Sequence, residues 1–135
     1  MSREITFTNK MDEVTRIAQF IDEVCEELGL DFATVSAIQL AIEEAVVNVI
    51  EYAYPDKVDE KSSLTVTAAD GEIVFVLSDS GVAFDPTLAQ EPDITLPAEA
   101  RPIGGLGIML VKRIMNEVAY ERIDGQNTLK MVKHI

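Results

Sequence analysis

Apolar residues recur at helical spacing from Val35 to Ala53, and this is the longest regular pattern in the chain. At about 100° per residue they form one stripe, as in a helix that packs against a core. The stripe consists of Val35, Ile38, Ile42, Ala45, Val46, Val49 and Ala53. Asp31 stands where an N-cap is expected, and Pro55 follows the last helical position. We therefore predict a central core helix between these two residues.

Two further segments precede the central helix. Apolar residues recur at helical spacing from Met11 to Leu28, and Gly29 is placed to end that helix. Residues 3–9 alternate between polar and apolar side chains, which predicts a first strand. Cys25 lies within the helical pattern and is the only cysteine, so we expect a small core residue and no disulfide framework.

The remaining strands are predicted as two hairpins, residues 64–68 with 72–78 and residues 118–123 with 128–135. Asp70-Gly71 separates the first pair and is a strong signal for a tight hairpin turn. The strand that follows this turn is apolar on both faces, which places it centrally in the sheet. The second hairpin is predicted to turn over residues 124–127.

A segment without periodicity runs from residue 80 to residue 103 and contains four prolines. A loop of this length in a compact domain is usually functional or disordered. Gly104-Gly105-Leu106-Gly107 then opens a third helix. This order of elements predicts one α+β domain over residues 1–135. Its architecture is a two-layer α/β sandwich, with a mostly antiparallel mixed sheet and helices on one face.

The charge balance restricts the partners. The 135 residues include 11 basic and 24 acidic side chains, for a formal net charge of −13. Such a field repels nucleic acid and anionic lipid, so we expect neither nucleic acid nor membrane as a partner. A bound polyphosphate would need backbone N–H groups and a divalent cation. The N-terminus lacks a signal-peptide pattern, and we expect a cytoplasmic protein.

Residues that suggest chemistry occur in three places. Glu44 and Asn48 lie four residues apart on one helix face, among apolar neighbours. Polar groups in such a setting usually have a partner, here a metal ion with phosphates, although a solvated face with ordinary ion pairs fits equally well. Asp79 directly follows the apolar strand and could accept a hydrogen bond from an exocyclic amine, with Gly81 allowing close approach. Asp-Ser-Gly is also a common turn.

The third place is the glycine-rich stretch at residues 104–107. Free N–H groups and the helix dipole make it a natural anion site, although a flexible hinge has the same composition. The dinucleotide fingerprint Gly-x-Gly-x-x-Gly is missing, and no Gly-Lys-Ser/Thr follows, so neither a Rossmann site nor a P-loop is predicted.

The three places occur in an order that resembles a known family. Residues 44–48, 79–86 and 104–107 look like the N, G1 and G2 boxes of the GHKL, or Bergerat-fold, ATPases, and the resemblance covers essentially the whole chain. It is greatest to the stand-alone serine/threonine kinases that act as anti-sigma factors in bacterial partner switching. Ala83 departs from the pattern, because many relatives have a second G1 glycine at this position.

The resemblance implies an ATP site with Mg²⁺. Asn48 would coordinate Mg²⁺, and Glu44 would be the catalytic carboxylate that activates the attacking hydroxyl. Asp79 would bind the adenine amine, with Gly81 beneath the base. The phosphates would be met by Gly104, Gly105, Leu106, Gly107 and the lid residue Arg101. The lid itself would lie within residues 80–103.

The function implied by the resemblance is phosphoryl transfer from ATP to a serine or threonine of an anti-sigma-factor antagonist. The protein would also hold a sigma factor or a similar regulator, and a homodimer is implied. The alternative is a non-catalytic module that binds ATP or ADP and sequesters its partner. A third reading is an interaction domain that no longer binds nucleotide.

Overall fold

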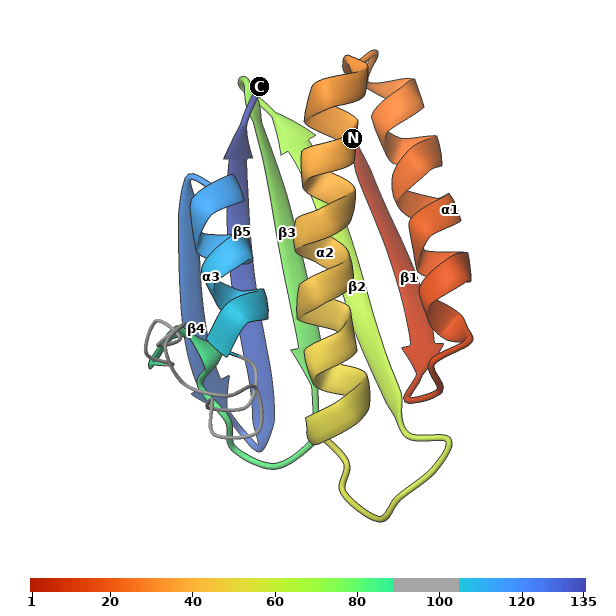
Figure 1. Ribbon diagram of the computed structural model, residues 1–135, viewed down its shortest axis with the longest axis vertical. Coiled ribbons are helices and arrows are strands. Elements are labelled where there is room, and N and C mark those ends of the chain that lie inside the picture. The colour runs from red at the N-terminus through yellow and green to blue at the C-terminus, as the bar shows by residue number, and fades with distance from the viewer. Residues whose placement is uncertain (89–104) are drawn as a thin grey trace.

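The computed structural model describes residues 1–88 and 105–135 and shows a sheet with helices over one face (Figure 1). The elements are β1 (Ser2–Thr8), α1 (Glu13–Glu27), α2 (Phe32–Tyr52), β2 (Lys61–Ala69), β3 (Glu72–Asp79), the 3₁₀ turn η1 (Pro86–Leu88), α3 (Gly105–Ile114), β4 (Glu117–Ile123) and β5 (Gln126–His134). This confirms the predicted α+β architecture and the predicted order of the main elements.

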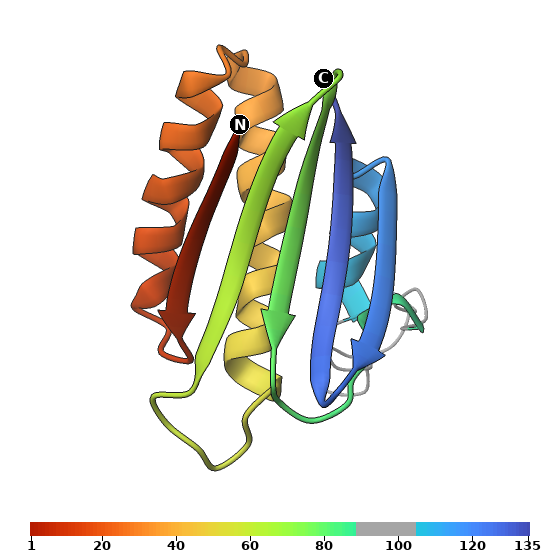
Figure 2. The same cartoon turned by 180° about the vertical axis from the view of Figure 1, so that it is seen from behind.

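The five strands are arranged in the order β1-β2-β3-β5-β4, so the apolar strand β3 lies in the middle, as predicted. Every pairing among these strands is antiparallel, and the sheet is therefore not mixed. In Figure 2 none of the described helices covers the opposite face of the sheet. All three helices thus share one layer, and the core lies between that layer and the sheet.

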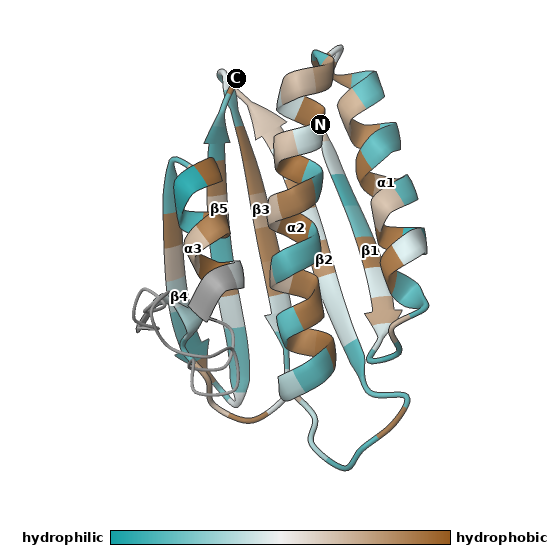
Figure 3. Cartoon of the chain, in the orientation of Figure 1, coloured by the Kyte–Doolittle hydropathy of each residue, from teal (hydrophilic) through white to brown (hydrophobic). Residues whose placement is uncertain are grey.

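Helix α2 forms the centre of this core (Figure 3). The side chain of Asp31 caps the helix by accepting a hydrogen bond from the Thr34 amide at 2.8 Å, which confirms the predicted start. Its buried positions are Ile38, Ala41, Ile42, Ala45, Val46 and Ile50. By length and apolar content alone α2 could cross a membrane. Its buried residues belong instead to one hydrophobic cluster with the sheet and the other helices.

Cys25 lies in the same core, as the sequence indicated, with 1% of its surface exposed. Burial raises the pKa of the Cys25 thiol, with a smaller contribution from the carboxylate of Asp22. The thiol is therefore protonated at neutral pH, and it behaves as a small apolar side chain rather than as a nucleophile.

Both hairpins turn through an Asp-Gly pair in the left-handed region. The φ angles are 53° and 78° at Asp70 and Gly71, and 54° and 79° at Asp124 and Gly125. Two positive φ angles in succession identify a type I′ turn, whose twist matches that of the flanking strands. The predicted turn over residues 124–127 was therefore too long. Strand β5 begins at Gln126, two residues earlier than predicted.

The shorter turn changes what faces the core. It brings Asn127 into the ladder, directly opposite Asp79 on β3. Strand β2 likewise begins at Lys61, three residues earlier than predicted, and pairs Ser62 with the other side of Asp79. Both extensions consist of polar residues, which the hydrophobic pattern alone could not assign to a strand.

The position of the core is tested by two neighbouring residues of β3. Phe75 faces the helices and is 1% exposed, whereas Val74 is on the face without helices. Phe75→Ala should lower the free energy of unfolding by about 3–5 kcal/mol, because it leaves a cavity in a packed core. Val74→Ala should cost about 1 kcal/mol or less. Urea denaturation of both variants measures the difference, and equal losses would contradict the assignment of faces.

Candidate functional site

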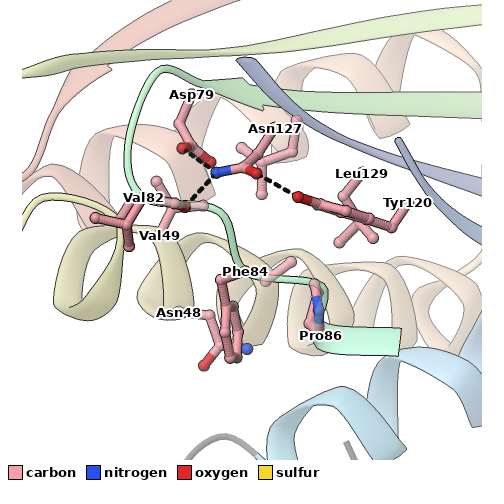
Figure 4. Close-up of a pocket in the computed structure, with 12 residues that line it drawn as sticks. Asn48, Val49, Asp79, Val82, Phe84, Pro86, Tyr120, Asn127 and Leu129 are labelled. Carbon is pink, nitrogen blue, oxygen red and sulfur yellow. Dashed lines mark hydrogen bonds between the residues drawn. The ribbon is translucent and has the colours of Figure 1, made fainter. Parts of the chain in front are cut away.

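A hollow lies between the C-terminal half of α2 and the ends of β3 and β5 (Figure 4). It has a volume of about 460 Å³, which includes space open to solvent. Its lining residues are Ala45, Asn48, Val49, Ala53, Leu77, Asp79, Val82, Phe84, Pro86, Tyr120, Asn127 and Leu129. Most of these side chains are apolar, so the few polar groups among them decide what the hollow can hold.

Asp79 is the charged group of the hollow and ends strand β3. Only 7% of its surface is exposed. Its Oδ1 accepts hydrogen bonds from the Gly81 amide and from Asn127 Nδ2, both at 2.9 Å. Asp79 lines the hollow, and no donor among the described residues binds its second carboxylate oxygen, Oδ2. This oxygen keeps its capacity to accept a hydrogen bond from a ligand.

Asn127 is a site residue that the sequence analysis missed, because the predicted turn included it. Its Nδ2 donates to Asp79 Oδ1 and to the Val82 carbonyl at 2.7 Å. Its Oδ1 accepts from the Tyr120 hydroxyl and from Arg122 Nη1. The signal was present in the sequence, since Asn127 is the polar member of the alternating series Asn127, Leu129, Met131.

The loop after β3 is fixed to the end of α2 at Gly81. A Cβ added at Gly81 would lie 2.1 Å from the Ala53 carbonyl oxygen, so only glycine fits there without a backbone shift. The next amide, that of Val82, donates to the same oxygen at 2.8 Å. Gly81 thus seats the loop on α2, and it is not one of the residues that line the hollow.

The buried residue Tyr54 also holds the loop after β3 in place. The Tyr54 hydroxyl accepts from the Ser80 amide at 2.8 Å and donates to the Lys61 carbonyl at 3.0 Å. It therefore joins the loop to the start of β2. The sequence analysis did not assign this tyrosine, since an aromatic residue after a helix carries no signal of its partners.

Asn48 and Glu44, one helical turn apart on α2, are placed differently. Asn48 is half-buried and lines the hollow with Asp79. Glu44 is also half-buried, but it lies against α3, where a Cβ added at Gly107 would be 2.6 Å from Glu44 Oε2. The absence of a side chain at Gly107 therefore leaves room for the carboxylate beside the first turn of α3.

The remaining predicted site residues are only partly described. Gly105 is the first residue of α3 and Leu106 the second, which agrees with a helix that opens at the glycine-rich stretch. Gly104, Arg101 and the lid beyond residue 88 lie outside the described residues. The structure thus brings together Asn48 and Asp79, with Glu44 and Gly107 in contact at the adjoining helix.

The comparisons with known proteins identify the family and the fold of this chain. The sequence profile of the histidine kinase-like ATPase domain matches residues 7–133. The chain is 29% identical over 97 residues to the serine/threonine-protein kinase BtrW of Bordetella bronchiseptica, covering 72% of this chain and 68% of that protein. It is 26% identical over 136 residues to the serine-protein kinase RsbW of Bacillus thuringiensis, covering 98% of this chain and 84% of that protein.

Solved structures share the fold at lower identity. The structure of the RsbU and RsbW domains of a Mycobacterium tuberculosis protein matches 99% of this chain, with a TM-score of 0.72 and 17% identity. This chain spans only 32% of the length of that one. A chain in the structure of the SiaB–SiaC complex from Pseudomonas aeruginosa matches 97% of this chain, with a TM-score of 0.60 and 14% identity. The match covers 89% of that other chain. With the profile covering nearly the whole chain, we conclude that this protein belongs to the histidine kinase-like ATPase domain family.

Proposed function

We propose that this protein is an ATP-dependent serine/threonine kinase that acts as an anti-sigma factor and phosphorylates an anti-sigma-factor antagonist. The observation that carries the proposal is the available Oδ2 of Asp79 within an apolar hollow that Asn48 also lines. The names of the relatives BtrW and RsbW, which are serine or serine/threonine kinases, support the same reading.

The hollow has the chemistry of a nucleobase site. Apolar side chains such as Val49, Leu77 and Leu129 line it, which suits the faces of a flat aromatic base. A carboxylate oxygen accepts a hydrogen bond from the amino group of adenine, whereas guanine presents a carbonyl at the same place on its ring. The site therefore favours an adenine nucleotide.

The residues present also fit Mg²⁺ in the way that phosphate-bound magnesium is usually held. Among the described residues no group of three or more His, Cys, Asp or Glu could hold a metal ion. Mg²⁺ retains several waters and takes most other ligands from phosphates, so one or two protein oxygens suffice. We propose that the side-chain oxygen of Asn48 is such a ligand. When bound, ATP would supply the phosphoryl group, and Mg²⁺ would neutralise part of the negative charge on the phosphates.

Glu44 is proposed as the catalytic carboxylate. It accepts the proton of the attacking serine or threonine hydroxyl and orients that hydroxyl toward the phosphate. Its place beside the first turn of α3 is consistent with phosphates bound at the N-terminus of that helix. Gly104, Gly105, Leu106, Gly107 and Arg101 are proposed to contact the phosphates, with the lid in residues 80–103.

The proposed protein partners are the antagonist that receives the phosphate and a sigma factor or similar regulator that is held without turnover. The SiaB–SiaC complex shows that a protein of this fold forms a complex with another protein. A homodimer and a cytoplasmic location are part of the same proposal. The net charge of −13 disfavours nucleic acid and anionic membranes as partners.

A second candidate function is a non-catalytic module that binds ATP or ADP and sequesters its partner. One observation favours it: Glu44 is not among the residues that line the hollow with Asn48 and Asp79. The two functions share the nucleotide site and differ in turnover, so a transfer assay separates them.

The nucleobase role of Asp79 is tested by Asp79→Asn. This change replaces a charged acceptor with an amide, so it should weaken ATP binding by about 1–3 kcal/mol. Calorimetry with ATP, with and without Mg²⁺, measures the loss. Asp70→Asn removes one negative charge at the far end of β3 and should leave the affinity unchanged. No binding of ATP or ADP by the wild-type protein would refute the proposal, and equal affinity for ATP and GTP would refute this role of Asp79.

The roles of the two helix residues are separated by Asn48→Ala and Glu44→Gln. Loss of a Mg²⁺ ligand in Asn48→Ala should abolish both tight Mg·ATP binding and transfer. Glu44→Gln keeps the shape but removes the base, so transfer should fall on the order of 10²–10⁴-fold with nearly normal binding. Glu43→Gln is the matched control, because Glu43 is exposed on another face of α2. If Glu44→Gln transfers phosphate at the wild-type rate, Glu44 is not the base, and Glu43 becomes the next candidate for that role. If the wild-type protein itself transfers no phosphate, the non-catalytic module is favoured.

The contact between Glu44 and α3 is tested by Gly107→Ala. The added Cβ must displace the carboxylate of Glu44, whose flexible end can move with little cost in stability. A catalytic group that is misplaced by about 1 Å can lose up to ~10²-fold in rate. We expect slower transfer with an unchanged melting temperature, as followed with radiolabelled ATP and thermal unfolding. A variant that transfers phosphate as fast as the wild-type protein would show that the contact has no role in catalysis.

A further inference from the structure

Three buried polar residues form one row across the sheet. Ser62, Asp79 and Asn127 are 5%, 7% and 6% exposed, and apart from the hydroxyl-bearing Tyr54 they are the buried polar or charged residues in the described part of the chain. They are also register partners: Ser62 lies opposite Asp79 on one side, and Asn127 lies opposite Asp79 on the other. Burial of polar groups is costly, so this row needs an explanation beyond folding.

Within this row Asn127 has no capacity left for a ligand. Both hydrogens of Nδ2 are donated, to Asp79 Oδ1 and to the Val82 carbonyl. Oδ1 already accepts two hydrogen bonds, from Tyr120 and Arg122. A carboxamide offers two donors and two lone pairs, and all four are in use. Asn127 therefore acts on a ligand only through its neighbours.

The neighbour that depends on Asn127 is Asp79. Two donors fix its Oδ1, one from the Gly81 amide and one from Asn127. Three further hydrogen bonds hold the loop after β3. The Val82 amide donates to the Ala53 carbonyl, the Ser80 amide donates to the Tyr54 hydroxyl, and Arg122 donates to the Gly81 carbonyl. Removal of Asn127 thus leaves the loop with these three hydrogen bonds, but it leaves the carboxylate of Asp79 with only the one from the Gly81 amide.

We infer that Asn127 is a positioning residue for base selection: it holds Asp79 Oδ1, so that Oδ2 is left as the acceptor for a 6-aminopurine. The inference rests on the proposed nucleotide binding. A fixed acceptor raises the affinity for a base that carries an amino group at one place and lowers the affinity for a base that lacks it. A carboxylate free to rotate spreads that acceptor over several directions and discriminates less.

The test compares ATP with purine riboside triphosphate, which carries hydrogen in place of the 6-amino group. Calorimetry gives the ratio of the two dissociation constants. In the wild-type protein ATP should bind about tenfold or more tightly, as expected for a hydrogen bond to a charged acceptor. In Asn127→Leu this ratio should fall at least threefold toward one, mainly through weaker ATP binding.

Ser62→Ala is the matched control, because Ser62 is the other register partner of Asp79 and its Oγ has no hydrogen-bond partner among the described residues. Its ratio should equal that of the wild-type protein. If Asn127→Leu does not fold, Asn127→Ser gives the same readout with a smaller polar side chain.

The outcomes separate the inference from the function on which it rests. If the Asn127 variants weaken both nucleotides by the same factor, the ratio is unchanged, Asn127 is merely structural, and the inference is wrong. If Ser62→Ala lowers the ratio as much as the Asn127 variants do, any change in the row suffices and the inference is also wrong. If the wild-type protein binds neither nucleotide, the proposed function itself fails.

Discussion

A carboxylate buried at the end of a central strand is costly unless donors surround it, and the arrangement of this site follows from that constraint. Asp79 ends β3, and its Oδ1 is bound by a backbone amide of the following loop and by a side chain of β5. Both donors must arrive at the same place. The loop must therefore turn back on itself directly after Asp79, and β5 must pair with β3 in one register.

The register of β5 depends on a turn that lies about 45 residues after Asp79 in the sequence. The Asp124-Gly125 pair forms a two-residue turn with positive φ at both positions, and β5 therefore starts at Gln126. A slip of one residue in this strand would point Asn127 away from the core and leave Asp79 with a single donor. The chemistry of the hollow thus depends on a surface turn that contacts no proposed ligand.

Much of the fold follows from the sequence because its signals are local. The stripe on α2, the Asp31 cap and the apolar strand β3 each have a pattern that a short window contains, and all three were predicted. For the candidate site, the sequence identified residues that suggest their own chemistry, such as Asp79 and Asn48, and the structure places both at one hollow. Their roles toward a ligand stay predictions. The alternating series gave a signal for the strand position of Asn127 but none for its partners, and Tyr54 and Arg122 had no signal at all. The roles of these three residues arise from contacts between distant segments.

The role of Gly81 shows the same limit. A glycine after the apolar strand suggested close approach of a ligand, whereas the structure uses its missing side chain to pack the loop against the end of α2. The placement of this glycine beneath the base stays a prediction. Residues 89–104, which include Arg101 and Gly104, lie outside the part of the chain that the structure describes, so their proposed contacts with phosphates rest on the sequence.

Central to the proposed function is the binding of an adenine nucleotide in the hollow between α2, β3 and β5. Its most direct test is an NMR titration of the ¹⁵N-labelled protein with Mg·ATP. We predict that the largest shifts cluster at the amides of Gly81 and Val82, the side-chain amides of Asn48 and Asn127, and the first turn of α3. Shifts confined to another surface, such as the groove between α1 and α2 lined by Val14, Ala18 and Glu43, would contradict the claim. So would a spectrum that Mg·ATP does not change.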